Sequence, residues 1–123
     1  MGVTFDTGAL IALERRQLRM LTVLRGCLNR RTRMTVPAPV LMEWWRGRTD
    51  HRELILEAVH LEPLTPELAR IIGEALAASP KSTAIDAAVM ASAAQRGDTV
   101  YTSDIDDLMR LQAVFPAVRV MST

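Results

Sequence analysis

Residues 3–13 read VTFDTGALIAL, and this stretch decides the fold class of the chain. Its first three residues favour a β-strand. The residues after them have helical character, with Asp6 or Thr7 as the N-cap of the expected helix. A strand that passes directly into a helix is the first half of a β-α-β unit, so we expect an α/β protein.

Segments of the same two kinds alternate along the rest of the chain. Strand-like segments are expected at 33–36, 59–61, 99–102 and 118–121. Helical patterns are expected at 7–16, 18–28, 37–47, 51–57, 66–78, 83–96 and 104–112. This alternation predicts an α/β/α sandwich, in which helices cover both faces of a central, mainly parallel sheet of four to five strands.

Size and composition limit what this fold can belong to. A chain of 123 residues, 49% of them hydrophobic, supports one core, so we expect a single domain across 1–123. The single cysteine, Cys27, excludes an intramolecular disulfide. The sequence has neither a signal-peptide pattern nor an apolar run of about 18 residues. We therefore expect a cytoplasmic protein with no membrane segment.

Overall charge gives no argument for nucleic-acid binding. Fifteen basic and 14 acidic residues leave a net charge of +1. All basic residues except Lys81 are arginines, which either suits bidentate phosphate contacts or reflects genomic base composition. One local cluster could follow a phosphate backbone or be a solvated surface: Arg25, Arg30, Arg31 and Arg33.

Five acidic residues stand where the expected elements begin or turn: Asp6, Glu43, Asp86, Asp104 and Asp107. Three of them have a structural alternative. Asp6 and Asp104 could cap helices, and Asp86 follows Thr83 at the spacing of a capping box. Glu43 differs, because it falls inside its expected helix and has no cap to make. A partly buried carboxylate there needs a partner or a raised pKa.

The five acids could meet at one edge of the sheet. Ligands bind outside the carboxyl ends of parallel strands, where Asp6 and Asp104 are expected. Glu43 and Asp86 would reach that edge from the early turns of their helices. Several carboxylates in one crevice stay ionised only if a cation neutralises them, and oxygen ligands favour Mg²⁺ or Mn²⁺ over zinc. Such an ion serves phosphodiester hydrolysis.

Four motifs, in this order, resemble the acidic motifs of PIN-domain nucleases: DTGALIAL at 6–13, EWWRG at 43–47, DAAVMASAA at 86–94 and TSDIDDL at 102–108. The resemblance covers essentially the whole chain. Within that superfamily the chain is most similar to the VapC-type toxins of bacterial toxin-antitoxin pairs, which are small Mg²⁺-dependent endoribonucleases. The resemblance therefore implies a PIN-like fold and metal-dependent cleavage of RNA.

The resemblance also assigns roles to individual acids. It implies that the metal ion is held, and catalysis carried out, by Asp6, Glu43, Asp86 and Asp104, with Asp107 as an accessory ligand. Asp106 is less suited to this role, because on a helix it points away from Asp104, whereas Asp107 shares its face.

Hydroxyl groups beside these acids would support them. The resemblance implies that Thr102 and Ser103 orient the metal ligands, and Thr7 could orient Asp6 or a water molecule. The chain departs from the family at Gly8, where a small polar residue is common. One supporting contact is therefore expected to be missing.

Residues next to the second motif could contact RNA. Trp44 and Trp45 are neighbours on a helix and cannot both face the core, so one of them is expected to stack on RNA or meet a partner, with Trp45 as the candidate. Arg46 and Arg48 could contact phosphates or pair with acids. His51 has no paired group and is not expected to act as a catalytic base.

Partners follow from the resemblance as well. VapC-type toxins are generally homodimers, and a cognate antitoxin neutralises them by packing its C-terminal segment on the early helices. Apolar residues that could form such a groove, or simply belong to the core, are Leu18, Leu21, Leu24, Leu54, Ile55 and Val59.

Two other functions compete with this interpretation. Residues 5–9, FDTGA, resemble the signature of aspartic proteases, but that motif needs preceding strands and an all-β body, and helical periodicity dominates here. The second is a PIN-like domain that binds RNA or a protein without turnover, which the intact acid set disfavours.

Overall fold

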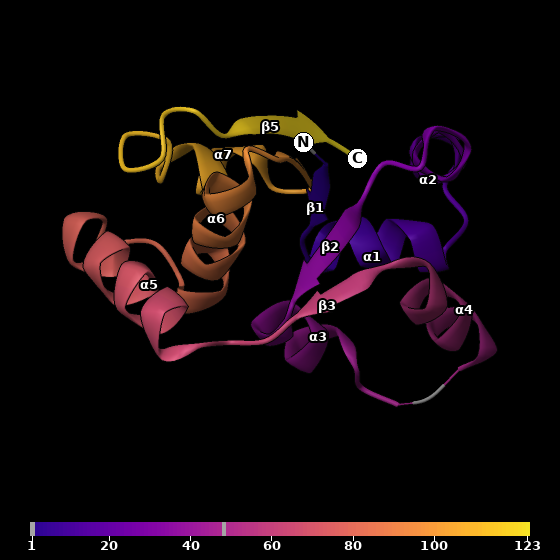
Figure 1. Cartoon of the computed structure of the whole chain (residues 1–123), viewed down its shortest axis with the longest axis horizontal. Helices are drawn as coiled ribbons and strands as arrows, with labels where there is room; N and C mark the ends of the chain where they lie inside the picture. Colours follow the sequence, from indigo (N-terminus) through magenta and orange to yellow (C-terminus); the bar gives the residue numbers. More distant parts are fainter. Residues whose placement is uncertain (1, 48) are drawn as a thin grey trace.

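A five-stranded, fully parallel sheet forms the centre of the protein (Figure 1). The computed structural model describes residues 2–47 and 49–123. The strands are β1 (Val3–Phe5), β2 (Met34–Pro37), β3 (His60–Glu62), β4 (Thr99–Thr102) and β5 (Arg119–Ser122). They lie in the order β3-β2-β1-β4-β5, and every neighbouring pair is parallel. The expected α/β fold is confirmed.

Helices cover both faces of this sheet. They are α1 (Thr7–Glu14), α2 (Leu18–Arg30), α3 (Ala38–Trp44), α4 (Asp50–Ala58), α5 (Pro66–Ala78), α6 (Ala84–Arg96) and α7 (Ile105–Met109). Helix α1 contacts α2 and α4 in one layer, and α5 packs against α6 in the other (Figure 1). This is the expected α/β/α sandwich. Within the described ranges, no helix has the length and apolarity that crossing a bilayer requires.

Local sequence signals explain most element boundaries. Every residue of β1 is buried, as expected for a strand covered on both faces. The hydroxyl of Thr65 caps α5 by accepting a hydrogen bond from the backbone N–H of Leu68. Helix α6 ends at Gly97, whose φ of 69° is the left-handed conformation that favours glycine.

Helices α1, α3 and α7 are shorter than the sequence predicts, and α1 ends at Glu14 instead of Arg16. Helix α3 ends at Trp44 instead of continuing to Gly47, because Trp45 leaves the helical conformation with a ψ of 76°. Helix α7 ends at Met109, and the next residues form tighter turns, such as the hydrogen bond from Leu111 N to Leu108 O (3.0 Å).

The arginine cluster lies away from the acids. Arg33 directly precedes β2, and its carbonyl oxygen accepts a hydrogen bond from the N–H of Val3, the first residue of β1 (2.9 Å). Arg30 and Arg31 stand just before it, so these arginines lie where the strands begin. Asp6 and Asp104 follow β1 and β4, at the opposite edge of the sheet. This cluster is therefore not placed to contact a phosphate bound by the acids.

Candidate metal-binding active site

The strand order of the sheet creates a binding crevice between β1 and β4. The chain runs from β1 outward to β2 and β3, then returns to the other side of β1 for β4 and β5. Ligands bind at such reversals, outside the carboxyl ends of the strands. Asp6 directly follows β1, and its N–H donates to the carbonyl oxygen of Tyr101 in β4 (3.3 Å). Asp104 follows β4, so these two acids stand at adjacent strand ends.

Asp6 is the most buried acid of the set, with 8% of its surface exposed. Its Oδ1 caps α1 by accepting a hydrogen bond from the N–H of Ala9 (2.8 Å). Burial raises its pKa to about 6, the charges of Asp86 and Asp104 add to this effect, and hydrogen bonds from Thr102 and Ala9 oppose it. A cation beside Asp6 would favour its ionised form.

Thr102 joins the two strand ends through a single hydroxyl group. The side chain is completely buried. Its Oγ1 accepts a hydrogen bond from the N–H of Asp104 (2.9 Å), and the hydroxyl bonds to the carboxylate of Asp6. A hydroxyl can donate and accept at once, so Thr102 fixes both acids relative to one another.

Asp86 approaches the crevice from the opposite helical layer, in the first turn of α6. The hydroxyl of Thr83 accepts a hydrogen bond from its N–H (3.1 Å), which is the helix cap that the sequence predicts. Burial is the largest cause of the raised pKa of Asp86, and the charges of Asp107, Asp104 and Glu43 raise it further. These charge effects place the acids in one electrostatic cluster.

Asp104 and Asp107 form a pair. Asp104 is the N-cap residue of α7, but its side chain makes no capping hydrogen bond of good geometry. A hydrogen bond with Asp107 is the main cause that raises the pKa of Asp104. Asp107 also accepts a hydrogen bond from Arg110 (2.8 Å). Asp106 acts on Asp104 only through its charge, as the least of the causes.

Glu43 stands in the last turn of α3, so the expectation that it lies in an early turn is wrong. It still reaches the crevice because α3 has only seven residues. Its Oε1 accepts a hydrogen bond from the hydroxyl of Thr7, the first residue of α1 (2.5 Å). Thr7 thus orients Glu43, whereas the sequence suggested Asp6 or a water molecule. Both residues line a cavity of about 270 Å³.

The donor set suits a hard divalent ion in its chemistry. Carboxylates supply oxygen ligands only, and their mutual repulsion favours a cation between them. Over residues 2–47 and 49–123, however, no group of three or more His, Cys, Asp or Glu side chains is already arranged to hold a metal ion. The charges of the acids affect one another, but their side chains are not arranged around a single ion position.

The residues expected to contact RNA differ in how far they are exposed. Trp44 is buried, with 3% exposed, and is the core member of the tryptophan pair; its ring centroid lies 5.9 Å from that of the partly buried Trp45. Arg46 is exposed, lines the Glu43 cavity, and donates to the carbonyl oxygen of Glu43 (3.2 Å). Arg48 lies outside the described residues.

Glu14 and Arg52, which lie beside the crevice, were not identified from the sequence. Glu14 receives a hydrogen bond from Trp44 Nε1 on one oxygen (3.2 Å) and an ion pair from Arg52 Nε on the other (2.9 Å). Arg52 also lines the Glu43 cavity. Glu14, Trp44 and Arg52 lie on α1, α3 and α4, so no local spacing in the sequence predicts their contacts.

Comparisons with known proteins agree with this fold. A family model described as the PIN domain matches residues 3–113. No curated protein sequence matches the chain. A chain in the crystal structure of VapBC2 from Rickettsia felis bound to a DNA fragment from their promoter has a TM-score of 0.80 at 12% identity, covering 100% of this chain and 99% of that chain.

Two further solved structures are similar over nearly their whole length. DNA-bound VapBC from Salmonella typhimurium has a TM-score of 0.72 at 16% identity, covering 99% of this chain and 98% of that chain. FitAcB from Neisseria gonorrhoeae has a TM-score of 0.69 at 16% identity, covering 97% and 96%. At such low identity these structures establish the fold. Because the family model spans almost all of the sequence, the protein belongs to the PIN-domain family, whose members are generally nucleases.

Proposed function

We propose that the protein is a metal-dependent endoribonuclease toxin of the VapC type, which hydrolyses phosphodiester bonds of cytoplasmic RNA and is neutralised by a cognate antitoxin. One observation carries the proposal: the charges of acidic side chains from four separate segments help to raise the pKa values of Asp6, Asp86 and Asp104. The membership of the PIN-domain family and the resemblance to VapC-type toxins support nucleic acid, and RNA in particular, as the substrate.

Four residues would hold Mg²⁺ or Mn²⁺, with Asp107 as an accessory ligand: Asp6, Glu43, Asp86 and Asp104. When bound, such an ion polarises the phosphodiester and lowers the pKa of an attacking water molecule. The exposed carboxylate of Asp104 would have to turn toward the ion, because the site is not closed. Asp6 would provide the fixed point, since Thr102 and the N–H of Ala9 hold its carboxylate.

The protein's own residues would orient the attack. The hydroxyl of Thr7 donates to Oε1 of Glu43 and so fixes the orientation of this carboxylate in the lining of the cavity. The second oxygen of Glu43 would then accept a proton from the attacking water or contact the ion. Arg46 and Arg52, which line the same cavity, would attract the phosphate, which the acids alone repel.

Cleavage of single-stranded RNA tests the proposal directly. Wild-type protein should cut RNA when Mg²⁺ or Mn²⁺ is present and stop when a chelator is added. Asp6→Asn and Asp86→Asn should each remove most of the activity, whereas Asp106→Asn, an exposed neighbouring acid, serves as the matched control and should keep it. RNA that stays intact with metal would leave the alternative of a non-catalytic RNA-binding domain. Two Asn variants that cut at the wild-type rate would show that these acids do not carry out the cleavage.

A groove between α1, α2 and α4 supports the antitoxin as partner. Its volume is about 180 Å³, and it is lined by Leu13, Arg16, Leu21, Leu24, His51, Leu54 and Ile55. Four of the six apolar residues singled out in the sequence therefore line it. Of the other two, Leu18 is exposed and Val59 packs against the core. An amphipathic segment of the antitoxin would bury Leu54, which is 63% exposed. Leu54→Glu should weaken antitoxin binding without loss of RNA cleavage.

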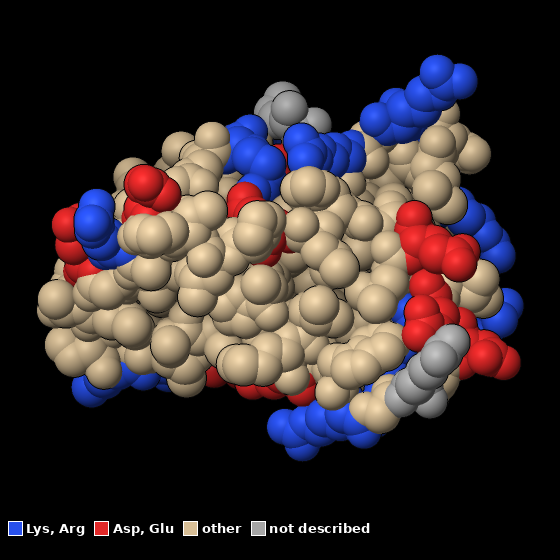
Figure 2. Space-filling model, turned by 60° about the horizontal axis from the view of Figure 1, so that its bottom comes forward, with Lys and Arg blue, Asp and Glu red and all other residues tan. Residues whose placement is uncertain are grey.

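The homodimer that the resemblance implies needs another surface. Figure 2 shows a broad face with few charged side chains, which gather along its margins. The elements α3 and β3 lie on the side of the molecule that this view brings forward, and they carry the exposed Met42 and Leu61. We place the second copy here. Analytical ultracentrifugation of Met42→Glu should then find a larger monomer fraction than for the wild type.

A further inference from the structure

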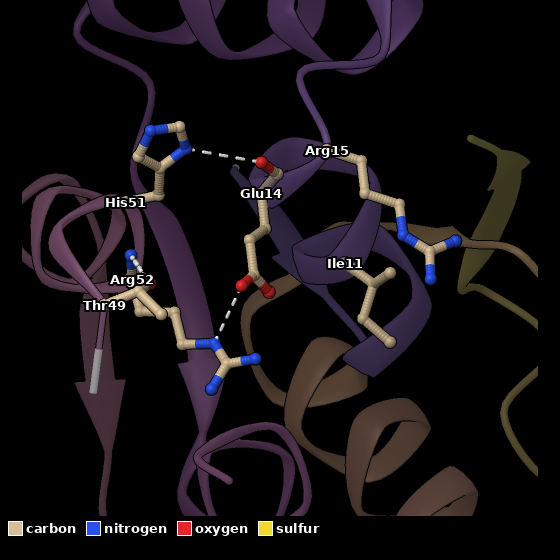
Figure 3. A pocket seen from close by; sticks show the side chains of 6 residues that line it. All are labelled: Ile11, Glu14, Arg15, Thr49, His51 and Arg52. Carbon is tan, nitrogen blue, oxygen red and sulfur yellow. Dashed lines mark hydrogen bonds and ion pairs between the residues drawn. The ribbon is translucent and has the colours of Figure 1, made fainter. Parts of the chain in front are cut away.

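A second cavity, of about 480 Å³, lies between the end of α1 and the start of α4 (Figure 3). Its lining residues are Ile11, Glu14, Arg15, Thr49, His51 and Arg52. Ile11 and Arg52 also line the Glu43 cavity, so the two hollows share a wall. A strand bound at one of them would therefore pass close to the other.

Arg52 is held in place before any ligand arrives. Its Nε donates to Oε2 of Glu14 (2.9 Å), and its Nη1 donates to the carbonyl oxygen of Gly47 (2.5 Å). The guanidinium carbon lies 5.9 Å from the ring centroid of Trp44. A guanidinium has five N–H groups, so two bonds leave donors for an anion. Binding to a side chain that is already ordered costs less conformational entropy.

Arg15 gives the lining of the cavity a net positive charge. The two oxygens of Glu14 accept from Trp44 and Arg52, which balances the charge of Arg52. Arg15 comes from the C-terminal end of α1 and is exposed. In Figure 3 Arg52 lies to the left of Ile11 and Arg15 to its upper right, so the cations flank an apolar floor. Guanidiniums on either side of an apolar side chain suit a sugar-phosphate backbone.

We propose that this second cavity is a subsite for a backbone phosphate of the RNA, further along the strand from the phosphate that the acids cleave. The subsite rests on the proposed nuclease function. Successive phosphates of a strand are only a few ångström apart, so a strand with one phosphate at the acidic edge carries further charges past the adjoining cavity. Ile11 offers the sugar between them an apolar contact.

Binding of a labelled single-stranded RNA of eight nucleotides tests the subsite. The assay uses fluorescence anisotropy with Mg²⁺ present, in an Asp86→Asn background that prevents cleavage. Arg15→Gln should weaken binding roughly fivefold and make the slope of log affinity against log salt about 0.7 less negative, the value for one lost phosphate contact. Arg70→Gln on α5, also an exposed arginine, is the matched control and should leave both quantities unchanged.

A second RNA locates the contact. A dinucleotide has too few phosphates to fill both cavities, so Arg15→Gln should bind it as the Asp86→Asn parent does. Arg52→Gln should reproduce the loss with eight nucleotides, and its melting temperature must be measured because Glu14 loses a partner. Arg15 makes no such contact with Glu14, so its variant tests the subsite even if Arg52→Gln unfolds.

The outcomes separate the subsite from the nuclease function. If the wild type cuts RNA but Arg15→Gln binds eight nucleotides with unchanged affinity and salt slope, the subsite is wrong, and an acidic protein segment becomes the better occupant. An equal loss for Arg15→Gln and Arg70→Gln would also overturn it, because the effect would then be general charge. If the wild type neither binds nor cuts RNA, the nuclease function and the subsite both fail.

Discussion

Gly8 and Ser103 approach so closely that position 8 has no room for a side chain. A Cβ built on Gly8 would lie 1.9 Å from Oγ of Ser103 and 2.8 Å from its Cβ. Gly8 belongs to the first turn of α1, and Ser103 stands directly before Asp104. The absence of a side chain at Gly8 therefore lets the turn after β4 close against α1, which brings Asp104 next to Asp6. The hydroxyl of Ser103 occupies the space where the sequence suggested a missing polar contact.

Gly8→Ala should destabilise the fold by about 1–3 kcal/mol, the usual cost of overpacking. Ser103→Gly removes the obstructing side chain, so the double variant should recover most of this loss. Urea unfolding of the four proteins in the cycle measures the coupling.

Gly73→Ala in α5 is the matched control, because nothing lies within 4 Å of a Cβ built there. Alanine favours helix over glycine, so this variant should be neutral or more stable by up to about 1 kcal/mol. Equal destabilisation in the Gly8→Ala single variant and in its double variant with Ser103→Gly would show that the close approach is not the cause.

Asp6 makes the apoprotein less stable as the pH rises. Its pKa is about 6 in the fold and 3.8 in a model compound, so between these values the folded state binds more protons than the unfolded state. The free energy of unfolding contributed by this group is therefore greatest at low pH and falls as the pH rises to about 6. A shift of this size corresponds to at most about 3 kcal/mol.

Asp6→Asn should flatten that part of the pH profile, because asparagine also caps helices but does not titrate. Urea unfolding at pH 4 and pH 7, with a chelator present, measures the difference. The gain of the variant over the wild type should be larger at pH 7. A gain that is the same at both pH values would mean that Asp6 titrates normally.

Metal binding should act in the opposite sense and stabilise the fold at neutral pH. An ion that binds only the folded state stabilises it by about 2.7 kcal/mol at a hundred times its dissociation constant. Thermal unfolding with millimolar Mg²⁺ or Mn²⁺, against sodium chloride of equal ionic strength, should show a raised melting temperature. Asp86→Asn should reduce the shift and Asp106→Asn should not. An unchanged melting temperature would argue against a shared ion site.

Local signals explain why so much of the fold was predictable. Asp6 and Thr83 cap the helices that the sequence predicted, and β1 changes to α1 at Asp6. The positions of Asp6 and Asp104 at adjacent strand ends also followed from parallel topology. Contacts between distant segments did not, because spacing in the sequence carries no signal for them. Arg52 pairs with Glu14 across two helices, and Thr7 bonds to Glu43 only because α1 and α3 meet at the crevice.

The bond between Thr7 and Glu43 leads to the last prediction. Thr7→Val keeps the shape of the side chain and removes the hydroxyl that fixes Oε1 of Glu43. If that carboxylate must be oriented for the reaction, kcat should fall roughly tenfold, as it does when partners of catalytic ligands are lost. Thr7→Ser retains a hydroxyl and should restore most of the activity.

Stability and a matched variant separate orientation from folding. Thr22→Val on α2 removes a comparable hydroxyl, which donates to the carbonyl oxygen of Leu18 on the helix surface (3.0 Å), and should leave kcat unchanged. Thr7→Val should keep a melting temperature close to that of the wild type, because the bond is only partly buried. If kcat falls only in proportion to the folded fraction, or if Thr7→Ser is as inactive as Thr7→Val, the hydroxyl does not position Glu43 for catalysis.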